Sequence, residues 1–151
     1  MEDIKRILVV SRSTKHCRKA VHYGIALAKT YGADLYVVHI FHDPFSLKGW
    51  NLPIAIGTLQ EEYKKMQASA RSALDEVIRS EQHQGRPIKV EEIITEGKPT
   101  HEIVNFVKKE KIDLVIVRGH KEGNLEHFLF GNDNEKILRK MPCSVLLVKR
   151  G

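Results

Sequence analysis

The sequence has few of the features of a secreted protein, of a protein stabilised by a structural metal, or of a membrane protein. Its 151 residues contain two cysteines, Cys17 and Cys143, which lie far apart and form no CxxC pair. That spacing predicts neither a disulfide framework nor a zinc site, so both thiols are expected to be reduced. No apolar run approaches the roughly 18 residues of a membrane-spanning helix, and the charged start of the chain has no signal-peptide pattern. We therefore expect a cytoplasmic protein without membrane contact.

Composition, length and net charge narrow the classes of protein to which this chain can belong. A hydrophobic content of 42% and a charged content of 29% are typical of a soluble globule, and the length predicts one domain over residues 1–151. The net charge of +6 would permit weak contact with nucleic acid. The basic residues are spread along the chain, however, close to acids or on expected helix faces. We favour a solvated surface over a nucleic-acid partner.

Apolar runs of strand length alternate with amphipathic stretches. Strands are predicted at residues 4–10, 34–41, 88–95, 111–118 and 144–148, and helices at residues 14–31, 58–80, from 99, and at about 133–140. This alternation predicts an α/β protein with a parallel sheet and helices on both faces. The helix at 14–31 has an apolar stripe that runs from Cys17 through Gly24 to Tyr31, and Gly32 is expected to end it.

Common catalytic and metal-binding patterns are absent. The sequence has no nucleophile elbow, HExxH or Walker loop, and His16 is not obviously aligned with Ser11 or Ser13 for catalysis. His39-x-x-His42-Asp43 could ligate a metal, but no third ligand has a fixed spacing, so we expect none. The protein is therefore not predicted to be an enzyme. Trp50, in an expected loop at residues 42–57, is predicted to cover a pocket or a partner surface.

The last third of the chain carries the candidate ligand site. An apolar strand at residues 113–118 is followed by a loop with Gly119, Gly123 and Gly131, and Asn132 with Glu135 can open a short helix. In open α/β folds ligands bind at the carboxyl ends of the strands, and a helix N-terminus favours anions.

Several segments, taken in order, resemble the universal stress protein family. They are Ile7-Leu-Val-Val10, Val37-Val-His-Ile40, residues 97–104 with a Gly-x-Pro turn, and the block from Gly131 to Val148. The resemblance implies a Rossmann-like, adenine-nucleotide alpha-hydrolase-like fold: an open five-stranded sheet of order 3-2-1-4-5 that forms a homodimer. It also implies two branches. One binds ATP through Gly-x2-Gly-x9-Gly-Ser/Thr and an aspartate after strand 1, and the other lacks the motif.

This sequence departs from the ATP motif at most positions. With Gly131 as the third glycine, Arg118 and Lys121 replace the first two, Asn132 replaces the Ser/Thr, and Ser11 replaces the aspartate. Long side chains obstruct the close approach of backbone to phosphate, and Asp133 would repel an anion. We therefore expect no cofactor. The alternative is that Arg118 and Lys121 act as phosphate ligands themselves. The candidate nucleotide pocket comprises Ser11, Ile40, Val117, Arg118, Gly119, Lys121, Gly131 and Asn132.

The final strand is expected to need a partner. An apolar edge strand is an aggregation hazard unless it is covered, and two-fold pairing with its own copy would cover it. The predicted homodimer interface is Val145, Leu146, Leu147 and Val148. Together with the resemblance, this predicts a stress-response protein that acts by binding protein partners whose identity the sequence does not give.

Overall fold

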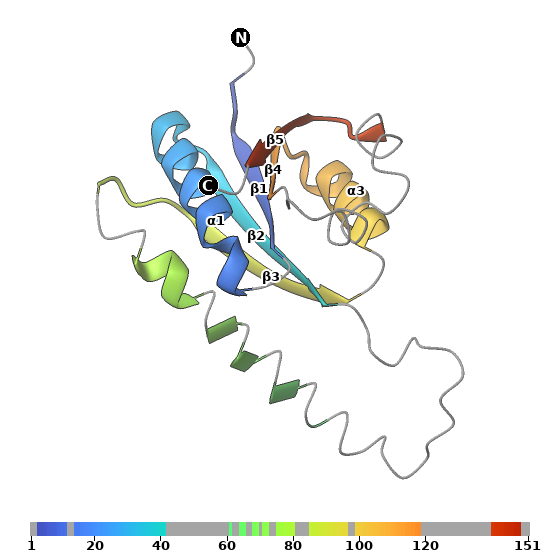
Figure 1. The fold of residues 1–151 in the computed structure, drawn as a ribbon. Coiled ribbons are helices and arrows are strands. Elements are labelled where there is room, and N and C mark those ends of the chain that lie inside the picture. The colour runs from blue at the N-terminus through green and yellow to red at the C-terminus, as the bar shows by residue number, and fades with distance from the viewer. Residues whose placement is uncertain are drawn as a thin grey trace.

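The computed structural model describes residues 3–11, 14–41, 61, 64–65, 68–69, 71–72, 75–80, 85–96, 99–118 and 140–148. Its elements are, in order, β1 (Arg6–Ser11), α1 (Thr14–Tyr31), β2 (Asp34–Phe41), β3 (Val90–Glu96), α3 (Pro99–Glu110), β4 (Leu114–Arg118) and β5 (Ser144–Val148) (Figure 1). The described residues between 61 and 80 are helical, within the range where the sequence predicted a helix. The expected loop at residues 42–57 and residues 133–139 of the last predicted helix lie outside the described residues.

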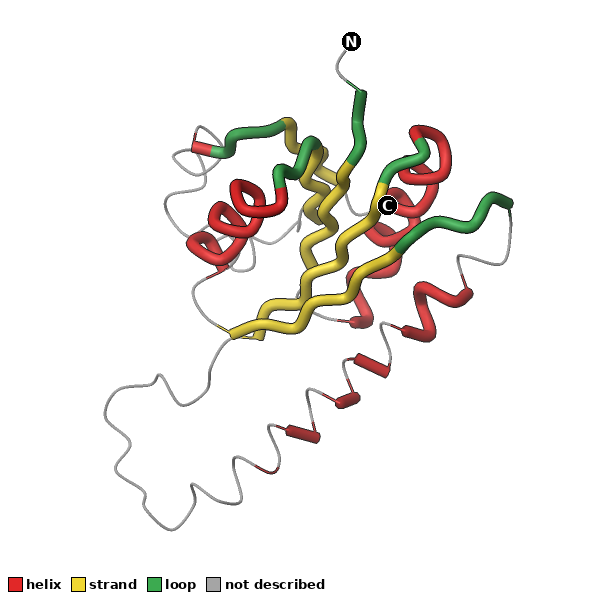
Figure 2. The backbone as a smooth tube through the Cα atoms, turned by 180° about the vertical axis from the view of Figure 1, so that it is seen from behind, coloured by secondary structure: helices red, strands yellow, loops and turns green. Residues whose placement is uncertain are grey.

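The strands form one parallel sheet in the order β3-β2-β1-β4-β5. This confirms the predicted fold class and strand order. Figure 2 shows the strands side by side, with helices on both sides of the sheet. β2 runs with β1 from the pair Arg6↔Asp34 to the pair Ser11↔His39. Because all strands are parallel, their carboxyl ends lie at the same edge of the sheet.

Alternate residues of each strand fill two separate cores. Ile7 and Val9 of β1 pack with α1, whereas Leu8 and Val10 pack with α3. All four side chains are buried. The central strands are therefore apolar on both faces, as a parallel sheet covered by helices requires. Among the described residues, no helix has the length and apolar character needed to cross a membrane.

The helices α1 and α3 end in the same backbone motif. Gly32 follows α1 with φ 66°, and the N–H of Ala33 donates to the carbonyl of Ala28 at 2.9 Å. These features form a Schellman cap, and they confirm the prediction for Gly32. α3 ends in the same way, although Lys111 takes the left-handed position with φ 51° and Ile112 N–H donates to the carbonyl of Val107. The prediction that Lys111 begins a strand was therefore wrong, because the helix cap uses Lys111 and Ile112.

Other boundaries and one buried position also needed correction. β1 begins at Arg6 and ends at Ser11, and β3 begins at Val90 rather than at residue 88. Tyr31 was predicted to face the core, but its side chain is 45% exposed. Tyr31 is the last residue of α1, directly before Gly32 of the cap. Pro99 begins α3, as predicted from its fixed φ.

Candidate functional site

The predicted pocket falls at the carboxyl edge of the sheet. Ser11 is the last residue of β1, Arg118 is the last residue of β4, and Ile40 precedes the last residue of β2. β1 lies between β2 and β4, so these three strand ends are neighbours. The chain leaves β1 toward β2 on one side, and β4 lies on the other. The gap between β1 and β4 is therefore the topological switch point, where open α/β folds bind ligands.

Only part of the pocket belongs to the described residues. The structure describes the backbone of Ser11, Ile40 and Arg118 and the whole of Val117, whereas Gly119, Lys121, Gly131 and Asn132 lie outside the described residues, as does Trp50. The Val117 side chain is 1% exposed and packs in the core on the α3 face. Val117 can therefore offer a ligand its backbone but not its side chain.

Arg118 is part of the β-ladder. It pairs with Val148 of β5, one residue beyond the pair Val117↔Leu147. The position that the ATP motif gives to its first glycine is thus an extended strand residue with a long cationic side chain. Glycine is useful in phosphate-binding loops because it adopts backbone conformations that other residues avoid. A residue in an extended strand does not need such conformations. The backbone of Arg118 is therefore paired within the sheet and is the last part of β4 before the candidate site.

His39 is a buried polar residue close to this edge. Its side chain is 3% exposed, and it is paired in register with Ser11. The other members of the candidate metal set, His42 and Asp43, lie outside the described residues. Within the part of the chain that the structure describes, no three His, Cys, Asp or Glu side chains are grouped so as to hold a metal.

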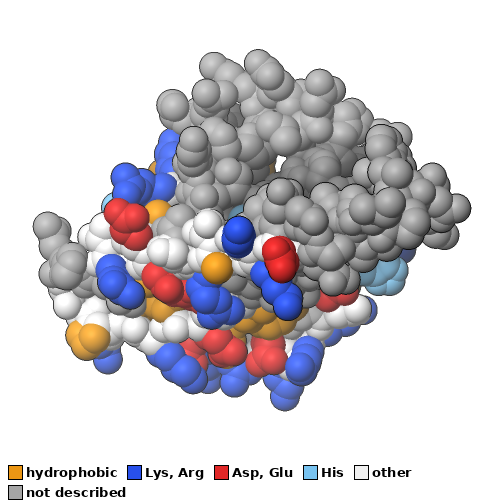
Figure 3. Space-filling model, turned by 90° about the horizontal axis from the view of Figure 1, so that it is seen from below, with side chains coloured by type: hydrophobic (Ala, Val, Ile, Leu, Met, Phe, Trp, Pro, Cys, Tyr) orange, Lys and Arg blue, Asp and Glu red, His pale blue; other side chains and the backbone are white. Residues whose placement is uncertain are grey.

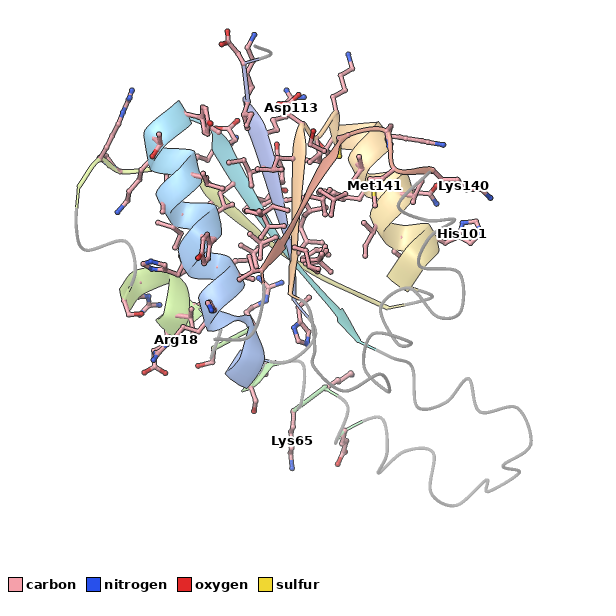
Figure 4. The ribbon with its side chains drawn as sticks, turned by 45° about the horizontal axis from the view of Figure 1, so that its top comes forward. Arg18, Lys65, His101, Asp113, Lys140 and Met141 are labelled. Atoms are coloured by element: carbon pink, nitrogen blue, oxygen red, sulfur yellow. The ribbon has the colours of Figure 1, made fainter. Side chains whose placement is uncertain are left out.

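Asp113 organises the opposite, amino-terminal edge of the sheet. Its Oδ2 accepts hydrogen bonds from the backbone N–H groups of Lys5 and Arg6, both at 2.8 Å. The Arg6 guanidinium donates to the carbonyl of Glu110 at the end of α3. In Figure 4 Asp113 lies at the end of the molecule opposite Arg18 and Lys65. This cluster joins β1 to the α3–β4 connection and is remote from the candidate pocket.

Sequence reasoning missed a pair of carboxyl groups beside the edge strand β3. Glu92 of β3 and Asp75 of the helical segment 75–80 share a side-chain hydrogen bond. Burial, the hydrogen bond to Asp75 and the Asp75 charge together raise the pKa of Glu92 to about 7, although Arg71 and Arg79 act in the opposite direction. The signal in the sequence was an acid, Glu92, at a strand position whose side chain is expected to face the protein core.

Cys143, just before β5, is a half-buried free thiol. Burial raises its pKa to about 11, and the nearby charge of Asp113 adds to this effect, while a hydrogen bond with the Val115 backbone opposes it. The thiolate is the reactive form. In a Cys17→Ser background, we expect a disulfide reagent at about pH 8 to modify Cys143 on the order of 100-fold more slowly than a free cysteine with its usual pKa. Absorbance of the released thiol would measure the rate, and equal rates in native and unfolded protein would contradict the prediction.

This chain is similar to known proteins in sequence and in fold. The model of the family described as "Universal stress protein family" matches residues 3–149. Universal stress protein MJ0531 of Methanocaldococcus jannaschii is 27% identical over 147 residues, which cover 97% of this chain and 82% of that protein. The structure of universal stress protein UspA from Lactobacillus plantarum superposes with a TM-score of 0.77 at 19% identity and covers 98% of this chain and 99% of its own.

Two further similar structures were solved with nucleotides. A universal stress protein from Archaeoglobus fulgidus in complex with dAMP has a TM-score of 0.58 at 18% identity, with 99% of this chain and 100% of that chain covered. A universal stress protein in complex with cAMP has a TM-score of 0.66 at 18% identity, with 98% of each chain covered. At these identities the similarity establishes a shared fold.

Proposed function

The chain belongs to the universal stress protein family, and from that premise we propose that it acts in the stress response by binding protein partners, without ATP and without catalysing a reaction. The observation that carries this proposal is the pairing of Arg118 with Val148 at the end of β4. A long side chain and a strand conformation occupy the place where the ATP motif needs a bare backbone. We also place the protein in the cytoplasm, where a free thiol such as Cys143 stays reduced.

The remaining motif positions support the same interpretation. Lys121 stands at the second glycine position, and Ser11 stands where the resemblance expects an aspartate at the end of β1. A serine hydroxyl lacks the negative charge with which a carboxylate would accept hydrogen bonds from a ribose or an adenine amine. Asp133 adds a negative charge beside the expected phosphate position. Lys121 and Ser11 thus each remove a contact that the ATP motif would supply, and Asp133 adds repulsion toward the phosphates.

Thermal unfolding with and without millimolar Mg-ATP tests this proposal. A ligand at ten times its Kd stabilises the folded state by about 1.4 kcal/mol, which corresponds to roughly 3–6 °C in Tm for a domain of this size. We expect a shift of less than about 1 °C for the unmodified chain, because Arg118 and Lys121 stand where the ATP motif requires glycine. A reproducible shift of several degrees would instead favour the nucleotide-binding alternative.

A reciprocal variant tests the physical cause. Arg118→Gly, Lys121→Gly and Ser11→Asp in one chain restore the two missing glycines and the missing carboxylate. If obstruction by side chains is the reason that ATP does not bind, this variant should gain a Tm shift with Mg-ATP. If it folds and gains none, obstruction is not the full cause, and the loop differs from the ATP-binding form in more than these residues.

Nucleotide binding is the second candidate function. The observation in its favour is that two proteins with the same fold were solved with cAMP and with dAMP. In this chain the switch point between β1 and β4 would offer backbone groups of Ser11 and Val117 and the cations Arg118 and Lys121. A nucleotide held in this way would depend on side-chain cations rather than on main-chain amides, so its affinity should fall steeply with added salt.

We further propose that the protein is a homodimer paired through β5. The sheet has two edge strands, β3 and β5. β3 carries Glu91, Glu92 and Glu96, and charged residues of this kind protect an edge from strand addition. β5 instead presents Leu147, which is 54% exposed, and the half-buried Val145 and Leu146. Of the two edges, the apolar one suits a two-fold contact with its own copy.

Nucleic-acid binding receives less support from the surface. In Figure 3 the Lys and Arg side chains of the visible face are interspersed with Asp and Glu. A nucleic-acid footprint is usually a continuous basic stripe or patch. Steeply salt-dependent retention of DNA or RNA would contradict this interpretation.

A further inference from the structure

The pair Asp75–Glu92 joins a helix to the edge of the sheet. Glu92 lies in β3 in register with Val37 of β2, whose side chain is fully buried in the core on the α1 face. Val90, two residues earlier, packs against the same core. Because side chains of a strand alternate between faces, Glu92 points toward the α1 face. Its neighbour Glu91 is exposed and is paired with Tyr36, which packs on the α3 face.

The helical segment 75–80 covers this part of the sheet. Its Val77 and Ile78 are buried in the core cluster that also contains residues of α1, β1 and β2. Figures 1 and 2 place the segment on the same side of the sheet as α1. Asp75, one turn before Ile78, brings its carboxyl group to Glu92. The segment therefore meets the edge strand through two apolar side chains and one pair of acids.

Two acids in hydrogen-bond contact require a proton between them. Glu92 Oε2 is buried without a hydrogen-bond partner, so an ionised Glu92 would keep an unsatisfied charged oxygen next to the Asp75 carboxylate. A protonated Glu92 can donate to Asp75, and the repulsion disappears. Among the described residues, the charged groups that act on Glu92 are Asp75, Arg71 and Arg79, all from the helix. The neighbouring position on β2 is the uncharged Val37.

We propose that the Asp75–Glu92 pair is a pH-sensitive latch, which holds the helical segment 75–80 on β3 while the two carboxyl groups share a proton and loosens it when both are ionised. The latch is separate from the partner-binding function proposed above and does not depend on it. Its chemistry is that of paired carboxyl groups in other proteins, in which like charges at close range cannot both ionise without cost. The exposed arginines moderate the repulsion without removing it.

The direction of the pH effect follows from linkage. The pKa of Glu92 rises from 4.5 to about 7 on folding. Between these values the closed state binds more protons than the open state, so its stability falls as the pH rises. The stabilising contribution is complete below the lower value and is lost as the pH passes through about 7. The latch would thus respond to alkalinisation near neutral pH, and acidification would tighten it.

Hydrogen exchange of the full chain, followed by mass spectrometry at several pH values, tests the latch. After correction for the intrinsic exchange rate, protection in peptides covering residues 75–80 and 90–96 should fall by roughly three- to tenfold between about pH 6 and pH 8.5, given the linkage and partial screening by solvent. Peptides from the centre of β1 should keep their protection, because they do not contact the pair. A flat protection profile in residues 75–80 would overturn the proposal.

Two variants on the same strand separate the latch from a general charge effect. Glu92→Gln cannot ionise but can still donate to Asp75, so it should remove the pH dependence and keep the helix protected at high pH. Glu91→Gln removes the same charge on the opposite face, and it should behave like the unmodified chain. If Glu92→Gln does not fold, Asp75→Asn removes the charge repulsion from the helix side and should reduce the pH dependence to the part that burial of Glu92 causes. An unchanged pH dependence in the folded variant, or its equal loss in Glu91→Gln, would refute the latch.

Discussion

Gly24→Val is expected to lower the free energy of unfolding by about 3 kcal/mol, near the upper end of overpacking costs. α1 crosses β1 so closely that a Cβ atom added at Gly24 would lie 2.5 Å from Cγ2 of Val9 and 3.1 Å from Cδ1 of Leu35. Val9 is fully buried and β-branched, so it cannot rotate away. The helix would have to move off the sheet. Urea unfolding followed by circular dichroism would measure the change.

Ala26→Val is the matched control for Gly24→Val. Ala26 lies on the exposed side of the same helix, so it tests the helix propensity of valine without the contact to β1. We expect a cost of about 0.5 kcal/mol at this site. A second check combines Gly24→Ala with Val9→Ala, because the space vacated at Val9 should accept the new methyl group. Equal costs for Gly24→Val and Ala26→Val would show that α1 does not approach β1 as closely as the structure describes.

Leu147→Lys is expected to dissociate the proposed dimer, with a rise in Kd of at least about 100-fold. Leu147 is 54% exposed, so the monomer loses little packing when it is replaced. In a two-fold β5 pairing, each dimer would lose two leucine contacts and bring two new cations together. The lost apolar burial alone amounts to about 3 kcal/mol if half of each side chain is covered, which corresponds to roughly two orders of magnitude in Kd. Light scattering coupled to size exclusion would give the mass.

Tyr31→Lys is the control for the dimer experiment. Tyr31 is 45% exposed at the end of α1, away from β5, and the substitution adds the same charge. This variant should keep the mass of the unmodified chain. A monomeric unmodified chain, or a Leu147→Lys variant with an unchanged dimer mass at micromolar concentration, would exclude β5 as the interface. Circular dichroism of both variants would establish that each is folded.

Sequence patterns predicted the core elements closely. The apolar run at residues 34–41 coincides with β2, because a strand buried on both faces leaves a continuous apolar run. The run at 144–148 coincides with β5. The prediction failed where a local motif competed with the pattern. Ile112 looked like part of a strand, yet its N–H completes the cap of α3 and its side chain packs beside Val107. Tyr31 continued the apolar spacing of α1, but it is the last residue of the helix and its side chain is 45% exposed.

The candidate site was predictable in its place more than in its composition. Strand order and parallel direction together bring the ends of β1, β2 and β4 to one edge, so Ser11, Ile40 and Arg118 stand at or next to neighbouring strand ends, and their role in binding stays a prediction. Val117 was expected there as well, but the alternation of the strand turns its side chain into the α3 core. Whether the Val117 side chain can reach a ligand depends on the face of the sheet on which it lies, and a one-residue change of register would place it on the other face.

By itself, the sequence determined the class of the fold, the extent of β2 and the residue types that stand where the ATP motif has glycines, because these depend on the periodicity and identity of residues that are neighbours along the chain. Only the tertiary structure decided which distant residues meet. Gly24 is critical because Val9 lies beneath it, and the pKa of Glu92 is raised to about 7 because folding buries its carboxyl group and brings Asp75 against it. Steric contact and charge interaction both act over a few ångströms of space, and the folded chain alone sets those distances.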